Sequence, residues 1–326
     1  MHKKLLSAAI AATMTLTLAA CGSAQDDGQG ADNPDAYIVG ICEQMEHVSL
    51  SEATRGFKDA LTELLGEDNV VFREQNANGE QTNCGTIIDG FVSEGVDLIL
   101  ANATWPLQAA ASATADIPIL GTSVTDYATA LNLEDFDGTV GGNISGTSDL
   151  VDLEAQAQII QELFPDAENV GLLYCSGEPN SVYQIETVRG YLEDMGYTCE
   201  VYAFTDVNDL ASVTQTACDN SDVIYTPTDN TVAANTETVA NVVIPAGVPV
   251  IGGDPGICSG CGVATIATDY YELGRLTGEL AAQILRGETD ISTLPIQYGA
   301  MQKLYNSANC EALNITVPDG YTAVEG

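Results

Sequence analysis

The sequence predicts an α/β protein with two lobes, each a doubly wound parallel sheet, joined by a hinge that the chain crosses three times. Two observations support this prediction. From residue 35 onward, short β-branched apolar runs alternate with longer amphipathic runs, which is the pattern of a parallel sheet covered by helices. The alternation occurs twice in tandem over about 290 residues, a length that suits two cores better than one.

The first lobe is predicted to contain four strands separated by helices. Each strand candidate is a short apolar run, and Gly66 and Gly95 stand where helices are expected to end. Strands are expected at residues 36–41, 70–75, 98–101 and 118–120, and helices at 51–65, 81–93 and 106–114.

The second lobe is predicted from a repetition of the same pattern. Its apolar runs are again short and again separated by amphipathic stretches of helical length. Strands are expected at residues 169–174, 199–204, 223–225 and 249–251, and helices at 150–163, 181–195, 207–218 and 231–243.

The hinge is predicted around Gly141-Gly142-Asn143, between the two copies of the pattern. A later helix at 270–285 has one apolar face and needs a sheet to pack on, so we expect it to return to the first lobe. Residues 296–304 are then expected to cross back. The predicted lobes are residues 36–145 with 269–294, and residues 146–268 with 295–326. Three crossings permit closure of the lobes without unwinding.

The N-terminus has the features of an export signal. Lys3 and Lys4 precede an uncharged, mostly apolar run that ends in Leu18-Ala19-Ala20-Cys21, which resembles the cleavage and lipidation box of a bacterial lipoprotein. A permanent membrane span is the weaker alternative, because it needs about 20 apolar residues. We expect residues 1–20 to be a signal peptide, Cys21 to be lipidated, and residues 21–35 to be a flexible tether. The protein would then sit on the outer face of the cytoplasmic membrane.

Charge and cysteine content narrow the classes of function. The formal net charge of −38 repels nucleic acid, and no nucleic-acid partner is expected. Cys21 aside, eight cysteines remain, and sequence cannot choose their pairing. Cys258 and Cys261 have the spacing of redox and zinc sites, but the residues after them indicate loop and strand, so a local disulfide or two free thiols is favoured. We expect no metal and no cofactor.

The candidate site lies in the loops at the carboxyl ends of the predicted strands, where open parallel sheets bind ligands. These loops contain no lysine or arginine, which disfavours an anionic ligand. They do contain carboxylates, hydroxyls, and the aromatic residues Trp105, Tyr127 and Tyr183. A zwitterion with a flat ring would suit such a set. The alternative is that acidic residues such as Asp229 only cap helices.

Several strings in these loops resemble a known family. Residues 40–47 (GICEQMEH), 76–80 (NANGE), 141–149 (GGNISGTSD) and 227–231 (PTDNT) are similar to ABC-transporter substrate-binding lipoproteins associated with tryptophan and other aromatic amino acids. The likeness extends from residue 37 to 318. It implies a type I periplasmic-binding fold that closes on an amino acid and delivers it to a permease served by ATPase subunits. We expect such a protein to act as a monomer.

The resemblance and the strand-end rule together select the candidate ligand-binding residues. Matching the family's loops by position gives Gln44, Glu46, Thr104, Thr125, Asp126, Ser176, Asn180, Ser181, Asp229 and Asn230. The strand ends add Trp105, Tyr127, Glu178 and Asp254. Trp105 and Tyr127 stand where the family usually has smaller residues or proline, which places larger side chains at the predicted cleft. Asp126 or Asp229 is expected to bind the ligand's ammonium group, and hydroxyls and backbone amides its carboxylate.

Two other functions stay open. The same module could bind an aromatic or quaternary amine that lacks a carboxylate, held by acidic and aromatic residues. A cell-surface enzyme is the less favoured alternative, because the chain shows no nucleophile with an adjacent base and no phosphate-binding glycine loop. We assign no catalytic residues.

Overall fold

The computed structural model describes residues 33–324. The predicted signal peptide, Cys21 and nearly all of the predicted tether lie outside this range. Within it, no helix combines the length and apolar character that a membrane span requires.

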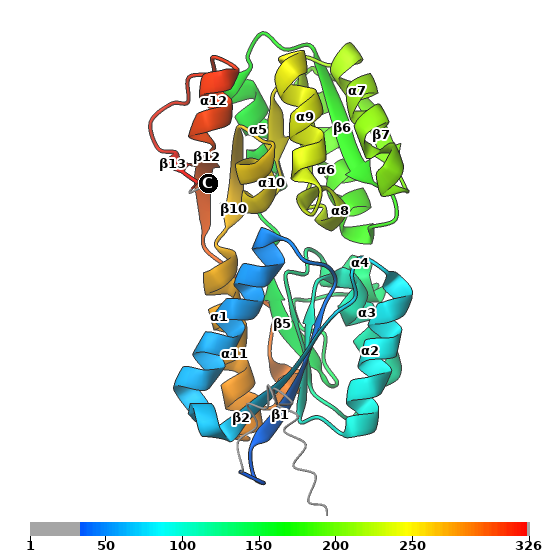
Figure 1. The fold of residues 1–326 in the computed structure, drawn as a ribbon, viewed down its shortest axis with the longest axis vertical. Coiled ribbons are helices and arrows are strands. Elements are labelled where there is room, and N and C mark those ends of the chain that lie inside the picture. Colours follow the sequence, from blue (N-terminus) through cyan, green and yellow to red (C-terminus); the bar gives the residue numbers. More distant parts are fainter. Residues whose placement is uncertain (1–32, 325–326) are drawn as a thin grey trace, which may run out of the picture. The chain divides into compact units, whose positions relative to one another are not determined.

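The first sheet contains six strands in the order β11-β5-β4-β3-β1-β2, all parallel (Figure 1). The strands are β1 (Tyr37–Glu43), β2 (Val70–Asn76), β3 (Leu98–Asn102), β4 (Ile119–Thr122), β5 (Ile144–Ser148) and β11 (Gln297–Tyr298). The helices that accompany them are α1 (Val48–Leu65), η1 (Glu67–Asn69), α2 (Gln81–Glu94), α3 (Thr104–Ala113), α4 (Tyr127–Leu131), α11 (Tyr270–Leu285) and η3 (Ile291–Thr293).

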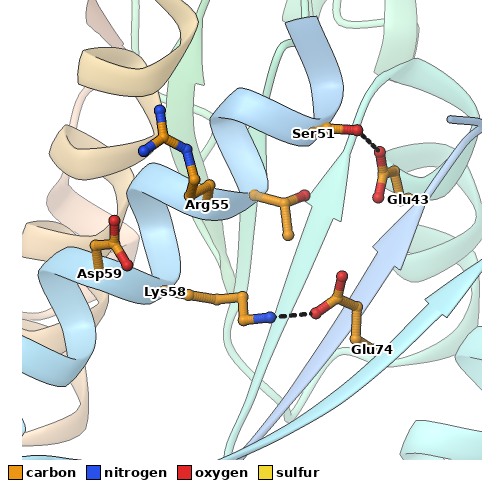
Figure 2. Close-up of a pocket in the computed structure, with 7 residues that line it drawn as sticks. Glu43, Ser51, Arg55, Lys58, Asp59 and Glu74 are labelled. Atoms are coloured by element: carbon orange, nitrogen blue, oxygen red, sulfur yellow. Dashed lines mark hydrogen bonds and ion pairs between the residues drawn. The ribbon is translucent and has the colours of Figure 1, made fainter. Parts of the chain in front are cut away.

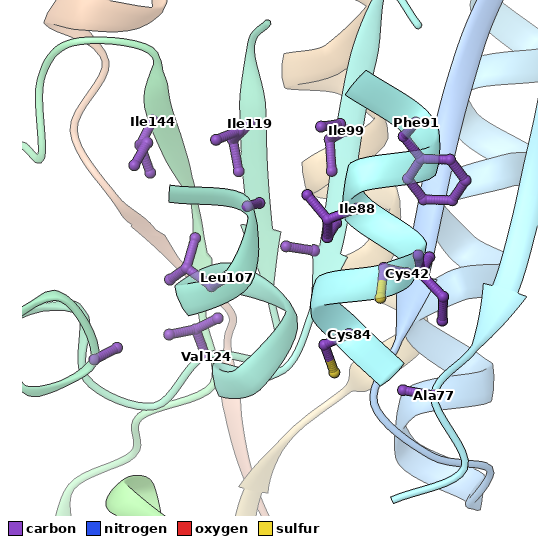
Figure 3. Close-up of a cluster of buried hydrophobic side chains, with 14 of the residues drawn as sticks. Cys42, Ala77, Cys84, Ile88, Phe91, Ile99, Leu107, Ile119, Val124 and Ile144 are labelled. Atoms are coloured by element: carbon purple, nitrogen blue, oxygen red, sulfur yellow. The ribbon is translucent and has the colours of Figure 1, made fainter. Parts of the chain in front are cut away.

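Helices cover both faces of this sheet because its strands are apolar on both faces. In β1, Val39 and Ile41 belong to the core beneath α1 and α11, whereas Cys42 belongs to the core beneath α2 and α3. The two-residue period of a strand produces this division. Figure 3 shows the second of these cores, where Phe91 and Ile88 of α2 face the sheet.

The second sheet contains seven strands in the order β13-β12-β10-β9-β8-β6-β7, and only the β10–β12 pair is antiparallel among the described residues. Its strands are β6 (Asn169–Cys175), β7 (Thr198–Phe204), β8 (Val223–Thr226), β9 (Val250–Gly252), β10 (Ala264–Thr268), β12 (Met301–Tyr305) and β13 (Thr322–Ala323). Its helices are α5 (Leu153–Leu163), α6 (Pro179–Asp194), η2 (Val207–Asp209), α7 (Leu210–Asn220), α8 (Asn230–Ala233), α9 (Thr236–Ala246), α10 (Pro255–Gly260) and α12 (Ser307–Ala312). Two further cores, one with α5 and α6 and one with α7 and α9, cover its faces.

The chain passes from one sheet to the other after β5, after β10, and between β11 and β12. Two of these passages lie a few residues later than the expected lobe bounds. The first follows Ser148 instead of residue 145, because Gly146 still pairs with Gly121 in the first sheet. The third follows Tyr298 instead of residue 294, because Tyr298 pairs with Ser148. The expected return of helix 270–285 to the first sheet is what the structure shows, since α11 packs along α1.

Glycines bring α1 and α11 into backbone contact. A Cβ added at Gly274 would lie 2.0 Å from the carbonyl oxygen of Ala53, and one added at Gly56 would lie 2.0 Å from that of Tyr271. A Cβ at Gly278 would lie 2.6 Å from the carbonyl oxygen of Phe57. Only residues without a side chain allow this spacing of the two helices.

Candidate functional site

Three adjacent strands of the first sheet end beside one another and bring several predicted site residues together. Gln44 follows β1, Thr104 and Trp105 follow β3, and Thr125 follows β4. Strand β3 lies between β1 and β4. The loops are joined by a backbone bond from the Gln44 amide to the Asn102 carbonyl, 3.2 Å long. This edge of the first sheet therefore forms one half of the candidate site.

Two polar side chains on this edge have buried atoms that find no partner in the described part of the chain. The Oε1 atom of Gln44 accepts a bond from the Trp105 amide at 3.2 Å, but its Nε2 has no hydrogen-bond partner within residues 33–324. The hydroxyl of Ser123 is in the same situation. Leaving a buried donor unpaired costs about 1–3 kcal/mol, so such atoms in a native protein call for an explanation, and a bound ligand supplies one.

The second sheet provides the facing half of the candidate site, but Glu178 there is fully engaged within the protein. Its Oε1 accepts bonds from the Thr231 amide (2.8 Å) and hydroxyl (2.7 Å). Its Oε2 accepts bonds from the Asn230 side chain (2.7 Å) and amide (3.1 Å). The carboxylate of Glu178 thus satisfies the first amides of α8, a structural role.

Asp229 is a helix cap as well. Its Oδ2 accepts bonds from the Cys175 amide (2.7 Å) and the Ser181 hydroxyl (2.8 Å), and its Oδ1 accepts the Val232 amide at 2.9 Å. Burial, followed by the nearby charge of Glu178, raises the pKa of Asp229 well above its ordinary value. These bonds leave little of the carboxylate for a ligand's ammonium group, so the capping alternative describes what Asp229 does in this structure.

Asp254 and Asp126 also begin helices. Asp254 accepts the Ile257 amide at 2.8 Å at the start of α10, and burial raises its pKa to about 6. Asp126 accepts the Thr129 amide at 2.6 Å at the start of α4 and stays partly exposed. All three capping aspartates follow strand ends, as the sequence analysis expected of a site, yet each serves its own helix.

Two hydrogen bonds connect the first residues of α1 to the second lobe. The His47 ring nitrogen Nε2 lies 3.1 Å from the Asn230 Oδ1, and the Ser49 hydroxyl donates to Asp254 at 3.3 Å. On the Asn180 side chain, Nδ2 donates to the Thr228 carbonyl at 2.8 Å, whereas the buried Oδ1 has no partner in the described part of the chain. Asn180 therefore offers a ligand an acceptor from the second lobe.

Tyr127 corrects one prediction. It was expected in the wall of the site, but it is 1% exposed and lies in the first lobe's core, where its hydroxyl donates to the Thr147 carbonyl at 3.0 Å. Gly121 and Gly146 make room for the ring, since a Cβ at either would lie 2.3 Å or 2.6 Å from the Tyr127 hydroxyl oxygen. The ring therefore stabilises the fold and does not face the site.

The structure also separates Glu46 and Ser176 from the other candidates. Both side chains are exposed. Glu46 helps to line a surface pocket with Glu43 and Glu74, and the Ser176 hydroxyl donates to the Phe204 carbonyl at 3.2 Å, towards β7. Trp105 and Tyr183, by contrast, are half-buried.

A distinct pocket of about 250 Å³ lies between α1 and the β1–β2 edge (Figure 2). Within it, Lys58 pairs with Glu74 at 2.6 Å and the Ser51 hydroxyl lies 3.5 Å from Glu43. Burial, together with Glu74 and Glu46, raises the pKa of Glu43 to about 7. The pocket contains none of the predicted site residues, and its basic side chains distinguish it from the candidate site.

No group of residues suited to a metal ion is present within residues 33–324. The eight cysteines of this range are free thiols, Cys258 and Cys261 among them. Of the two interpretations left open for that pair, the structure has the free thiols.

Asp149 is a candidate that the sequence analysis did not select. It directly follows β5, where the chain first leaves the first sheet, and it is 4% exposed. Its Oδ2 accepts the Tyr270 hydroxyl at 2.7 Å, while its Oδ1 has no partner in the described range. The strand-end rule could have found it, since Asp149 ends the string GTSD and follows a strand like the other candidates.

Comparison with known proteins places these features in a family context. A family profile described as ABC transporter substrate binding protein matches residues 38–324. The chain is 31% identical over 303 residues to a tyrosine-binding protein of Clostridioides difficile strain R20291, covering 90% of this chain and 87% of that protein. It is 30% identical to an ABC domain of Streptococcus pneumoniae solved in complex with L-Trp, with a TM-score of 0.82 over 87% of this chain and 96% of that one. A ligand-free, open substrate-binding protein with adhesive properties from Clostridium difficile is also 30% identical, with a TM-score of 0.68 over 89% of this chain and 100% of that one.

Proposed function

The chain belongs to the family of ABC-transporter substrate-binding proteins, and we propose that it captures an aromatic amino acid between its two lobes and delivers it to a permease. Its two parallel-sheet lobes are those of the type I periplasmic-binding fold. Relatives that bind tyrosine and tryptophan support the ligand class.

One observation carries the proposal. Buried polar atoms that have no partner among residues 33–324 occur on both strand edges, and they are complementary, a donor on one edge and an acceptor on the other. Gln44 Nε2 on the first lobe can only donate, and Asn180 Oδ1 on the second can only accept. A free amino acid carries an acceptor and a donor on one carbon atom. It can therefore satisfy both edges at once, and it needs no lysine or arginine from the protein.

The aromatic part of the proposal rests on Trp105 and Tyr183. Trp105 is the second residue of α3 on the first lobe and Tyr183 lies in α6 on the second, and both rings are half-buried. Helix α6 contacts α4 of the first lobe, so Tyr183 lies close to the junction of the lobes. A flat side chain between two such rings gains contact area and stacking.

The arrangement of the lobes supports capture by closure. Identity to the L-Trp complex and to the open, ligand-free relative is the same 30%, yet the TM-score is higher with the complex, 0.82 against 0.68. The bonds from His47 and Ser49 to the second lobe are contacts that a closed form makes. We take this structure to be close to the ligand-binding form.

A lipid on Cys21 would tether the protein on the outer face of the cytoplasmic membrane, beside its permease. Tethering raises the effective concentration of the receptor at its partner without any new contact. The lipoprotein box at residues 18–21 supports this part of the proposal. Metabolic labelling with a fatty acid tests it, because label should enter the wild type and not Cys21→Ser.

Isothermal titration calorimetry with the twenty amino acids tests the ligand. The tightest binding is expected for tyrosine, tryptophan or phenylalanine, and no binding to any amino acid would refute the proposal. Titration with tyramine and tryptamine tests the alternative of an amine receptor. Mass spectrometry of the recovered ligand tests the alternative of an enzyme, since a binding protein returns its ligand unchanged.

A further inference from the structure

We propose that Asp149 is the counter-ion for the ammonium group of the bound amino acid, an assignment that rests on the proposed function. Asp149 lies in a string that resembles the family but was not among the candidate ligand-binding residues. The assignment places the charged end of the ligand at the hinge, between the first and second passages of the chain.

The geometry around Asp149 leaves one oxygen for a ligand. Oδ2 is fixed by the Tyr270 hydroxyl at 2.7 Å, and Tyr270 begins α11, just after the second passage. Oδ1 is buried and has no partner within residues 33–324. A carboxylate oxygen accepts readily from an ammonium N–H, and the bond is stronger when one partner is charged.

Three other acids of the site, Glu178, Asp229 and Asp126, do not combine burial with a carboxylate oxygen that lacks a partner. Glu178 accepts bonds from backbone and side-chain donors of Asn230 and Thr231, and both oxygens of Asp229 are engaged. Asp126 is partly exposed, where water weakens its attraction for a cation. Asp149 alone of these four combines burial with an oxygen that has no hydrogen-bond partner among the described residues.

The electrostatics of Asp149 favour a cationic ligand. Burial, with a smaller contribution from the charge of Asp254, raises the pKa of Asp149 to about 6, although the Tyr270 hydroxyl and the nearby Thr125 side chain act to lower it. The hydroxyl of Tyr127 is the other titratable group near enough to sense its charge. None of these neighbours is a cation. A buried carboxylate without a positive partner is costly, and an ammonium group at Oδ1 would remove that cost.

An ammonium group at Asp149 also fixes the orientation of the amino acid in the site. With its ammonium group at the hinge, the ligand's carboxylate would point along the strand edge of the first lobe, where Ser123 follows the neighbouring strand β4 and Gln44 follows β1; both carry donors without a partner in the described range. The ring then extends towards Trp105 and Tyr183. The amino acid would thus contact the hinge and both lobes together, which makes its affinity depend on closure.

The test compares wild type with Asp149→Asn in three ligand series, measured by calorimetry at pH 7.5. The series are L-tyrosine and L-tryptophan, the deaminated acids 3-(4-hydroxyphenyl)propionate and indole-3-propionate, and the amines tyramine and tryptamine. Asparagine keeps the shape and removes the charge. We expect Asp149→Asn to weaken amino-acid binding by about 30-fold or more, and binding of the deaminated acids by less than about threefold.

Two controls separate a binding role from a structural one. Asp269→Asn removes an exposed carboxylate next to the second passage, which caps α11 through the Glu272 amide, and should leave affinity unchanged. In wild type, lowering the pH through 6 should weaken binding of the amino acids more than of the deaminated acids, because Asp149 gains a proton. If Asp149→Asn does not fold, the same pH series in Asp254→Asn isolates Asp149, because Asp254 is the other buried carboxyl of the site with a pKa of about 6. A difference between the two ligand series that persists in Asp254→Asn supports the inference, and one that disappears overturns it.

The outcomes distinguish this inference from the proposed function. If wild type binds amino acids and Asp149→Asn binds them within threefold, the inference fails and the proposed function stands. An equal loss for the deaminated acids also overturns it, since that points to a structural role. If wild type binds only the amines and Asp149→Asn loses them, the proposed function fails while Asp149 keeps its role as counter-ion. If wild type binds no member of any series, both fail.

Discussion

Gly274→Ala should destabilise the protein, because α11 crosses α1 at backbone contact. The added Cβ would lie 2.0 Å from the Ala53 carbonyl oxygen, whereas ordinary contact begins at 3.4 Å. The helices would have to separate by the difference, roughly 1.4 Å. The helices are also in close contact at Gly278 on the same face of α11, since a Cβ there would lie 2.6 Å from the Phe57 carbonyl oxygen.

Two opposing effects set the magnitude. Alanine is favoured over glycine inside a helix by about 1 kcal/mol. Overpacking costs about 1–3 kcal/mol when side chains can adjust, and more when they cannot. The obstacle to Gly274→Ala is the backbone of Ala53, which cannot rotate away, so we take the upper part of that range. The net loss should be about 2 kcal/mol, which lowers the melting temperature by several degrees.

Gly90→Ala is the matched control. Gly90 lies in α2, is exposed, and has no heavy atom within 4 Å of an added Cβ. The same substitution there should stabilise the protein by up to about 1 kcal/mol. Urea unfolding followed by circular dichroism, without ligand, measures both. If Gly274→Ala is as stable as Gly90→Ala, the close helix contact is not a constraint and the reasoning is refuted.

Three further predictions concern polar groups. Gln44→Leu removes the unpaired Nε2 and the acceptor for the Trp105 amide, and should weaken amino-acid binding about tenfold by calorimetry. Glu43→Gln should raise the unfolding free energy at pH 8 by up to about 3 kcal/mol and change little below pH 4.5. The pKa of Glu43 is about 7 in the folded protein and 4.5 ordinarily, so the wild-type free energy of unfolding falls as the pH rises from about 4.5 to 7. Urea unfolding at several pH values measures this difference. Glu178→Gln should lower the unfolding free energy by about 2–4 kcal/mol, because donors of Asn230 and Thr231 lose their charged acceptor. An unchanged urea midpoint with lost ligand binding would instead make Glu178 a ligand group.

The long elements of the fold are those that sequence predicts well. Helix α1 was expected at 51–65 and spans Val48–Leu65, and the helix expected at 270–285 is α11 with the same bounds. Over four turns, a helical period of apolar residues is distinct from other patterns. The helix expected at 231–243 is two, α8 and α9, because Asn235 leaves the helical conformation between them. Such a break depends on one residue and leaves the apolar pattern almost unchanged.

Short elements were missed for a related reason. Helices α4 and α10 have five and six residues, too few to show a period. Each is started by an aspartate side chain that accepts an amide three residues later. In the sequence, these aspartates were indistinguishable from ligand-binding carboxylates, because both kinds follow strands.

The same ambiguity limited prediction of the site. Gln44 and Thr104 lie where strands of the first sheet end and Asn180 where a strand of the second sheet ends, as the family's loops and the strand ends together predicted. The strand-end rule could not show that Glu178 is occupied by Thr231, 53 residues further along the chain. Nor could it place the Tyr127 ring, whose space comes from glycines on two neighbouring strands. Which carboxylate is free depends on donors brought together only by the fold.

The hinge and the contacts between the lobes indicate which interactions stabilise the closed form. The passages are held to one another by the Asp149–Tyr270 bond and by the pairing of Tyr298 with Ser148, so the pivot is ordered independently of the ligand. The bonds that join α1 to the second lobe, from His47 and Ser49, are two side-chain hydrogen bonds of 3.1 Å and 3.3 Å. Each is worth only about 1 kcal/mol against competition from water. These two bonds therefore add little to the stability of the closed form, and a ligand that satisfies the unpaired atoms on both edges would supply the differential affinity that shifts the population towards it.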